Sequence, residues 1–382
     1  MDFRPTEEQA AAAGLAAQIF GDLATHDRLA AAGTGSDAEL WKALTAAGLT
    51  AAVEDVGLLG LVLLLEEQGR ATAQVPYAAT CVYGVLALTR HGSAAQRARL
   101  LPALGSGDAV ATGAFPRRGR ITASQDGLLT GTAPAVPWLR EATHVLVPDE
   151  AGALWLVRTD APGVRTSAVE TTAPWSAASL TLTGAAAERI GGEGAYADVL
   201  AVARTAFAGL QAGVCAGSLA RAVEYTSTRE QFGRPLSTNQ GVMLRAADAY
   251  MDTEAIRVTA YEAAWRVDEG LPAGHHALTA AWWASEAGKR VVHAGQHLHG
   301  GMGADLDHPV HRHFLWGRQL DAYLGCGSEL LAELGALLAE GGSEGPSGAQ
   351  PGTEPDEAPE AREVAEAPEE PGEPEAPEGD AA

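Results

Sequence analysis

The sequence predicts an α+β protein in which two helical regions flank a middle antiparallel β domain. Up to Leu104 the chain is rich in Ala and Leu at helical spacing, whereas from Ala109 short apolar runs alternate with Gly, Pro and Thr. After Asp198 long helical stretches return, and 382 residues suffice for two or three domains. We predict a helical domain over 1–108, the β domain over 109–197, a four-helix bundle over 198–340 and a disordered tail over 341–382.

Local signals mark individual helices in the N-terminal region. Ser36 and Glu39 have the spacing of a capping box, which predicts that a helix begins there. The apolar stretch from Leu58 predicts a buried helix that ends at Gly69. The apolar run Val56–Leu65 is about ten residues long, too short to cross a bilayer. A further short helix is expected from Ser93 to Leu104.

The middle region has the pattern of a β domain. Short runs rich in β-branched residues and leucine are separated by Gly, Pro, Asp and Thr, as in antiparallel sheets joined by turns. The runs are Leu128–Thr132, His144–Pro148, Ala153–Val157 and Ser179–Thr183.

The C-terminal region is predicted to form an antiparallel bundle, because its helical stretches are long and the joins between them are short. The expected helices are Val199–Arg229, Asn239–Glu269, Ala277–Leu298, His311–Leu324 and a last one, Ser328–Glu340.

Charge is concentrated at the C-terminus. The chain has 49 acidic and 26 basic residues and a net charge of −23. Residues 341–382 hold thirteen acidic side chains and one arginine. The net charge of this tail is therefore −12, and that of the remaining chain is −11. The balance excludes nucleic acid, which requires a basic surface. A tail of Pro, Glu, Ala and Gly cannot bury enough apolar surface to order itself, and we expect a solvated segment rather than an interaction arm.

Cysteine usage and the N-terminus indicate a cytoplasmic protein without membrane association. Cys81, Cys215 and Cys326 are far apart and form no metal-spaced pair. The first residues lack the apolar core of a signal peptide. Six histidines crowd one region but have no Cys or carboxylate partners at ligand spacing, so we expect no metal site. They are His293, His297, His299, His308, His311 and His313.

Two segments carry the most specific pattern. The first reads Arg229-Glu230-Gln231-Phe232-Gly233-Arg234-Pro235, and the second reads His297-Leu298-His299-Gly300-Gly301-Met302-Gly303. Taken singly, Arg229 has the simpler interpretation of a salt bridge at a helix end, and the glycine pair that of a helix stop. Their combination at this spacing needs a further explanation.

The two segments and the order of the domains resemble the acyl-CoA dehydrogenase family over roughly residues 5–340. Gln240 and Asp248 stand at the offsets that the family pattern has, with Arg245 between them. The resemblance implies FAD as cofactor, an acyl-CoA substrate and an electron-transfer flavoprotein as a partner. In the family both segments reach across a subunit interface to the FAD of a neighbour.

The resemblance also assigns cofactor-binding roles. Arg229 would hold the pyrophosphate, for which a guanidinium fork is suited. Gln231 and Phe232 belong to the same segment, with the Phe232 ring beside the adenosine. His297 stands where the family has Gln and still permits a donor. Gly300 and Gly301 let the backbone approach the cofactor.

The segments that line the flavin ring in the family are changed in this chain. Thr112–Arg118 stands in place of a Thr-Glu-Pro loop and keeps only the proline. Ala133–Trp138 stands in place of a Trp-Ile-Thr strand and does not preserve it. In the family, each subunit contacts the flavin ring of its own FAD through these segments. That part of the flavin site is therefore not preserved in this chain.

The catalytic base is also missing. Abstraction of a proton next to a thioester carbonyl requires a carboxylate. Leu324 occupies the usual place of the glutamate, and Ala203 occupies the alternative place on the first bundle helix. We therefore predict no catalytic residue in this chain. Arg204 follows Ala203 and has two interpretations. It contacts a CoA phosphate, or it is an exposed arginine on the surface.

This pattern of loss resembles the partner-type subunit of actinobacterial heterotetrameric acyl-CoA dehydrogenases, some of which oxidise CoA thioesters of steroid side chains. The chain would then contribute FAD contacts to a related catalytic subunit in a hetero-oligomer. Two alternatives stay open: a self-sufficient flavin enzyme with a relocated base, for which Glu224 and Glu254 are poorly spaced, and a non-catalytic scaffolding paralogue. No residue indicates the acyl group.

Overall fold

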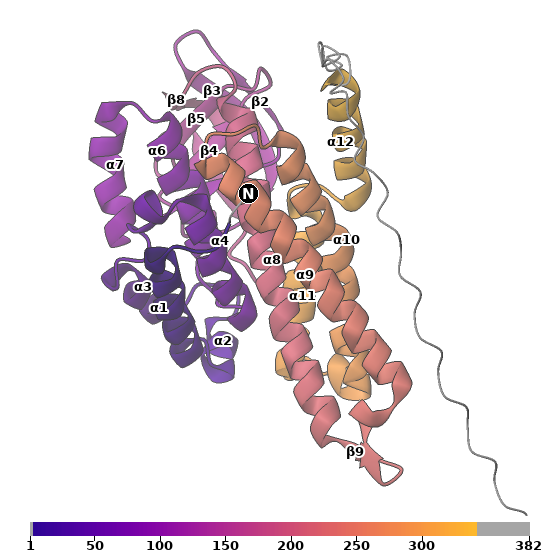
Figure 1. Cartoon of the computed structure of the whole chain (residues 1–382). Coiled ribbons are helices and arrows are strands. Elements are labelled where there is room, and N and C mark those ends of the chain that lie inside the picture. Colours follow the sequence, from indigo (N-terminus) through magenta and orange to yellow (C-terminus); the bar gives the residue numbers. More distant parts are fainter. Residues whose placement is uncertain (1–2, 342–382) are drawn as a thin grey trace, which may run out of the picture. The chain divides into compact units, whose positions relative to one another are not determined.

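A helical region, a β region and a helical bundle follow one another in the computed structural model, which describes residues 3–341 (Figure 1). This is the predicted fold class. The residues up to Glu340 pack as one compact unit. The predicted tail, 341–382, lies outside the described residues except for Gly341, the last residue of a helix.

The N-terminal region is helical throughout. Its helices are α1 Glu7–Leu23, α2 His26–Ala32, α3 Ala38–Ala46, α4 Val53–Ala71, α5 Tyr77–Ala79, a π-helical segment Thr80–Leu86, α6 Ala87–His91 and α7 Ala94–Ser106. Ser93 caps α7 in a capping box, as the predicted start implied.

Two predicted helix ends in this region are wrong. Asp37, not Ser36, caps α3: its carboxylate accepts hydrogen bonds from the Glu39 and Leu40 amides. The Ser36 amide instead donates to Glu141 at the edge of the β region. Helix α4 continues past Gly69, because this glycine is a packing position inside the helix and not its stop.

The β region consists of two four-stranded sheets, with strand orders β1-β4-β5-β8 and β2-β3-β7-β6. All pairings within them are antiparallel except that of β1 with β4, which is parallel. The strands are β1 Ala111–Gly113, β2 Arg120–Ala123, β3 Leu128–Val136, β4 His144–Pro148, β5 Leu154–Arg158, β6 Val164–Ala168, β7 Ala178–Ala186 and β8 Glu188–Ile190.

The C-terminal region is the predicted bundle. Its helices are α8 Ala195–Thr228, α9 Gln240–Asp268, α10 Gly274–Leu298, α11 Pro309–Tyr323 and α12 Gly327–Gly341. The short strands β9 Glu230–Gln231 and β10 Arg234–Pro235 form a hairpin between α8 and α9, at one end of the bundle (Figure 1). Helix α8 is the central helix, buried along most of its length.

Two stretches of the described chain are long and apolar enough to cross a membrane, Ala195–Thr228 and Pro309–Ala339. The first is the core helix α8 and is mostly buried, and the second is broken between α11 and α12. Length and composition alone do not separate such segments from ordinary core helices.

Candidate functional site

The first sequence segment forms the exposed hairpin that follows α8. The Arg229 amide donates to the Tyr225 carbonyl and closes the helix, and the Leu236 amide donates to the Arg229 carbonyl and closes the loop. Phe232 lies at the tip with a φ of 54° and a fully exposed ring. A positive φ is strained for an aromatic residue, and its exposed ring gains no burial in the isolated chain.

The second segment begins in the last turn of α10. His299 is buried, and its Nδ1–H donates to the Gly295 carbonyl at 2.7 Å. Gly300 has a φ of 61°, which favours glycine, and no atom lies within 4 Å of where a Cβ would stand on Gly300 or Gly301. The backbone of this turn is therefore open to a ligand.

The structure brings the two segments together. The His299 ring stacks on the Tyr225 ring, with centroids 4.9 Å apart and planes 20° apart. Tyr225 stands one helical turn before Arg229, and His299 directly precedes Gly300. The stacked pair therefore fixes the glycine turn to the end of the helix that carries Arg229.

Arginines without a hydrogen-bonded ion-pair partner gather at this end of the bundle. In the part of the chain that the structure describes, four arginine side chains between the last turns of α8 and the start of α9 have no hydrogen-bond or ion-pair partner. They are Arg221, Arg229, Arg234 and Arg245. Unpaired guanidinium groups favour an anionic ligand, because an anion supplies the missing charge-assisted hydrogen bonds.

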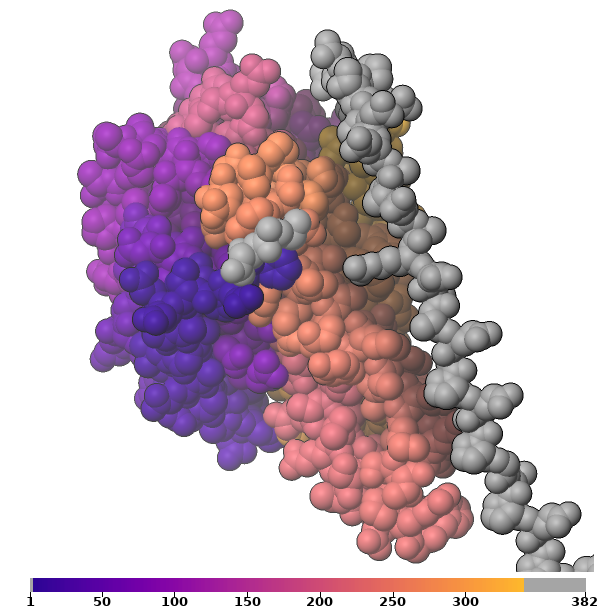
Figure 2. Space-filling model, viewed as in Figure 1, coloured from indigo at the N-terminus to yellow at the C-terminus, as the bar shows by residue number. Residues whose placement is uncertain are grey.

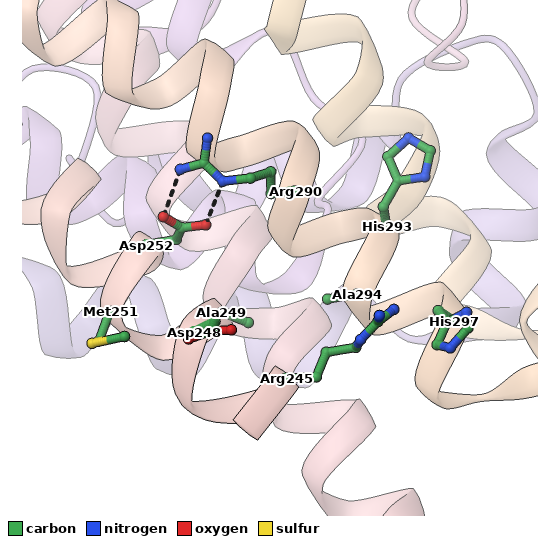
Figure 3. A pocket seen from close by; sticks show the side chains of 9 residues that line it. All are labelled: Arg245, Asp248, Ala249, Met251, Asp252, Arg290, His293, Ala294 and His297. Carbon is green, nitrogen blue, oxygen red and sulfur yellow. Dashed lines mark hydrogen bonds and ion pairs between the residues drawn. The ribbon is translucent and has the colours of Figure 1, made fainter. Parts of the chain in front are cut away.

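A cavity of about 640 Å³ lies between α9 and α10, and of these four arginines Arg245 lines it (Figure 3). Each helix contributes residues at helical spacings of three and four, so two helix faces form opposite walls. The lining residues are Arg245, Asp248, Ala249, Met251 and Asp252 from α9, and Arg290, His293, Ala294 and His297 from α10.

The polar groups of this cavity differ in their availability. Arg290 is held by Asp252 through two hydrogen bonds of 2.8 and 2.6 Å. Arg245 and Asp248 have no such partner. Partial burial, with the nearby charge of Arg318, lowers the pKa of His293. The cavity therefore offers a free cation and a free carboxylate, which suits a ligand with both phosphate and hydroxyl groups.

Sequence reasoning placed Arg229, Gln231, Phe232, His297, Gly300 and Gly301 in the site, and all lie at this end of the bundle. Only His297 lines the cavity itself. The Gln231 side chain is exposed and donates to the Glu230 carbonyl. Sequence reasoning missed Asp252, Arg290 and His293, although the spacing of Arg290, His293 and His297 on one helix face could have indicated a shared surface.

Both positions that the resemblance assigns to the catalytic base are buried. Ala203 is inaccessible to solvent and Leu324 almost so. The predicted surface position of Arg204 is wrong: its guanidinium is only 7% exposed and forms two hydrogen bonds with Glu333, at 2.8 and 2.6 Å. It therefore ties α8 to α12.

A second, smaller cavity of about 190 Å³ marks where the changed ring-binding segments meet. Ala114 and Pro116 come from the first segment, Ala135 and Pro137 from the second, and Tyr323 from the end of α11. Sites for drug-sized ligands span about 300–1,000 Å³. This cavity is smaller than that range.

Aromatic rings fill the space next to the small cavity. Phe115 stacks between Tyr83 and Tyr196, at centroid distances of 5.0 and 5.6 Å. Phe207 packs edge-on against Tyr323 at 4.9 Å. The Tyr83 and Tyr323 hydroxyls share a hydrogen bond of 2.9 Å, and burial raises the pKa of both. The rings form one closed cluster with its polar groups satisfied.

Family models match most of the chain. The acyl-CoA dehydrogenase N-terminal domain matches residues 6–108, and the acyl-CoA dehydrogenase C-terminal domain matches residues 191–335. The acyl-CoA dehydrogenase FadE27 of Mycobacterium tuberculosis is 38% identical over 373 residues, covering 89% of this chain and 99% of the relative. FadE28 of the same organism is 32% identical over 355 residues, covering 88% and 98%.

Solved structures agree with this assignment. A chain of a variant of the steroid ACAD Tcur3481-Tcur3483 has a TM-score of 0.84 and 42% identity, covering 88% of this chain and 99% of that chain. A chain of the ChsE4-ChsE5 complex from Mycobacterium tuberculosis has a TM-score of 0.83 and 35% identity, covering 89% and 99%. The protein belongs to the acyl-CoA dehydrogenase family.

Proposed function

We propose that this chain is the partner subunit of a FAD-dependent acyl-CoA dehydrogenase complex and contributes contacts to a FAD whose flavin ring lies in a related, base-bearing subunit. The observation that carries the proposal is the contrast between its two sites. Arg229, Phe232 and His297, which the family offers to a neighbour, are exposed at one end of the bundle, where His297 also lines the large cavity. The chain's own ring site is small and lies beside a closed aromatic cluster.

The residues at the open end suit the adenosine diphosphate part of FAD. Arg229 supplies a guanidinium fork for the pyrophosphate, Gly300 and Gly301 permit close backbone approach, and Phe232 offers an apolar face. Gln231 and His297 add hydrogen-bonding groups. When bound, FAD supplies the hydride acceptor for α,β-dehydrogenation of an acyl-CoA thioester. The base belongs to the partner, because Leu324 and Ala203 cannot take a proton.

The relatives support the proposed complex and its substrate class. Two similar chains were solved in assemblies named as pairs, one of them a steroid ACAD, which supports a hetero-oligomer acting on the CoA thioester of a steroid-type acyl group. We further propose that an electron-transfer flavoprotein accepts the electrons and that the complex works in the cytoplasm.

The test is a flavin count on the co-expressed complex with Arg229 variants. The chain is co-expressed with each base-bearing acyl-CoA dehydrogenase of its organism, and FAD is titrated into the deflavinated complex. Arg229→Ala should weaken FAD by roughly ten- to a hundredfold, because a charge-assisted contact contributes about 1.5–3 kcal/mol. Arg229→Lys should recover only part, since an ammonium lacks the planar fork.

Three results would contradict the proposal. If Arg229→Ala lowers the melting temperature but leaves FAD affinity intact, Arg229 is a structural residue. Flavin bound by the chain alone, together with turnover, would support a self-sufficient enzyme. A complex without flavin would support a scaffolding paralogue.

A further inference from the structure

A histidine caps the N-terminus of α11, shortly after the glycine turn Gly300–Gly301. His308 has extended backbone dihedrals, with φ −80° and ψ 131°, and its Nδ1 accepts a hydrogen bond of 3.2 Å from the Val310 amide. The usual capping residues, Ser, Thr, Asp and Asn, accept through oxygen atoms. An imidazole nitrogen accepts only while it carries no proton, so the cap on α11 depends on pH.

Hydrogen bonds fix the tautomers of two neighbouring imidazoles. His308 accepts at Nδ1, so its neutral ring carries the proton at Nε2. His299 donates from Nδ1 to the Gly295 carbonyl at 2.7 Å, so Nε2 is its unprotonated nitrogen. A proton taken up by His308 enters at Nδ1 and sets an N–H against the Val310 N–H. A proton taken up by His299 leaves its hydrogen bond intact, so the acid-sensitive contact is the cap.

A stack of three rings joins this cap to the cofactor surface. The His308 ring packs edge-on against the His299 ring, with centroids 5.0 Å apart and planes 60° apart, and His299 stacks on Tyr225. His299 directly precedes Gly300, and Tyr225 stands one helical turn before Arg229. The hairpin of β9 and β10 projects from the bundle in Figure 1, and its visible face is uncovered in Figure 2. The position of the glycine turn beside this hairpin therefore depends on contacts inside the bundle, such as the stack.

The side chains that face His308 come from three other elements and from its own loop. They are His299 at the end of α10, Arg221 on α8, His26 at the start of α2 and Asp305 on the loop. Partial burial lowers the pKa of His308 below its ordinary value of 6.5, the three basic side chains lower it further, and the Asp305 carboxylate opposes them. The stabilisation from the cap is therefore complete above pH 6.5 and is lost as the pH falls below that value.

We propose that neutral His308 is a positioning residue for the glycine turn and that its protonation weakens the binding of FAD in the complex; this rests on the proposed function. The added proton breaks the hydrogen bond to Val310. The partial positive charge of the helix N-terminus and the guanidinium of Arg221 then repel the charged ring. The ring stack loses its outer member, and the glycine turn is no longer held in the position from which its backbone contacts the cofactor.

The test compares three side chains at position 308 in the assembled complex. His308→Asn keeps an oxygen that accepts the Val310 amide at every pH, whereas His308→Ala has no cap at any pH. FAD is titrated into the deflavinated complex at pH 7.5, 6.5 and 5.5. Wild type should bind FAD about three- to tenfold more weakly at pH 5.5 than at pH 7.5, a range that corresponds to the usual contribution of an N-cap. His308→Asn should bind FAD tightly at all three pH values, and His308→Ala should bind it weakly at all three.

A second readout needs no flavin. Amide hydrogen exchange at Val310 is measured in the full-length chain, and variants are compared at the same pH because chemical exchange itself depends on pH. At pH 5.5 the amide should exchange faster in wild type than in His308→Asn, and at pH 7.5 the two should agree. His275→Asn, at the opposite end of α10 from His299, is the matched control and should behave as wild type in both measurements.

Two results overturn the inference. Equal pH dependence of FAD affinity in wild type and His308→Asn would assign the titration to other groups, such as His293 or His297. Wild-type FAD affinity in folded His308→Ala at pH 7.5 would show that the cap does not position the turn.

Failure of the proposed function gives a different pattern. In that case no variant would bind FAD at any pH, and the effect on FAD would be refuted with it, while pH-dependent exchange at Val310 would still report the cap. FAD binding that is lost in Arg229→Ala but does not depend on pH or on position 308 would refute only the role of His308.

Discussion

At the residue scale, the same side-chain type has opposite roles depending on burial and partner. Arg204 stands beside the lost base position, but its guanidinium is buried and occupied by Glu333. Arg229 is exposed at the end of the same helix and has no counter-charge. A buried guanidinium with a bidentate partner is structural, whereas an unpaired one at an open turn can bind an anion.

His313 gives a prediction about pH at this scale. Burial lowers its pKa from 6.5 to about 4, while its ring nitrogens face the Arg70 and Pro309 carbonyls. Between pH 6.5 and 4, His313 is therefore protonated in the unfolded chain but stays neutral in the native chain. The free energy of unfolding should be fully retained above pH 6.5 and should fall by roughly 2–4 kcal/mol as pH drops to 4.

Urea denaturation at pH 7 and pH 4.5 measures how much the free energy of unfolding falls between these pH values. His313→Gln should lose that part of the pH dependence, and His26→Gln, at an exposed position, should keep it. An unchanged slope in His313→Gln would show that other groups carry the acid sensitivity.

Contiguous site residues can be proposed from the sequence, whereas residues that only the fold brings together cannot. Arg229, Phe232 and Gly300 lie in short segments whose pattern is visible along the chain. Asp252 and Arg290 meet across two helices, so their pairing depends on a helix register that the sequence does not display. Arg204 was misread for the same reason, because its partner stands 129 positions away.

At the element scale, glycines decide how closely α4 and α8 approach. A Cβ on Gly69 of α4 would lie 2.2 Å from the Leu210 carbonyl oxygen of α8, and one on Gly213 would lie 2.0 Å from the Glu66 carbonyl oxygen. The helices thus contact each other backbone to backbone. Sequence analysis read Gly69 as a helix stop, because a glycine near the end of an apolar run has that meaning when no tertiary contact is known.

A matched pair of substitutions tests this contact. Gly69→Ala should destabilise the protein by at least about 2 kcal/mol, because the methyl group meets backbone that cannot move aside. Gly14→Ala, at an exposed position of α1 where no atom lies within 4 Å of the added Cβ, should stabilise it by about 0.5–1 kcal/mol. Chemical denaturation of both variants gives the comparison, and equal effects would mean that helix propensity alone is at work.

At the scale of the whole molecule, the chain combines one closed site with one open site. The closed site is built from four segments distant in sequence, which bring Tyr83, Phe115, Phe207 and Tyr323 into one cluster. The sequence predicts that the ring-binding motifs are changed, but the filling of the space by aromatic rings is visible only in the fold. The long bundle helices were predictable because their apolar pattern extends over many turns.

The last prediction follows from this closure. The isolated chain should show no acyl-CoA dehydrogenase turnover, and Leu324→Glu should not create any, although it restores a carboxylate at the usual base position. A general base contributes roughly 10²–10⁴ in rate only when substrate and flavin lie within its reach. Here the adjoining cavity is about 190 Å³, and the hydrogen-bonded Tyr83–Tyr323 pair lies beside it. Dye-coupled assays measure turnover with straight-chain and steroid-type acyl-CoA thioesters in the presence of added FAD. A thermal melt shows whether each variant is folded. Turnover by folded Leu324→Glu would show that the site opens to hold both ligands and that the lost glutamate alone accounts for the inactivity.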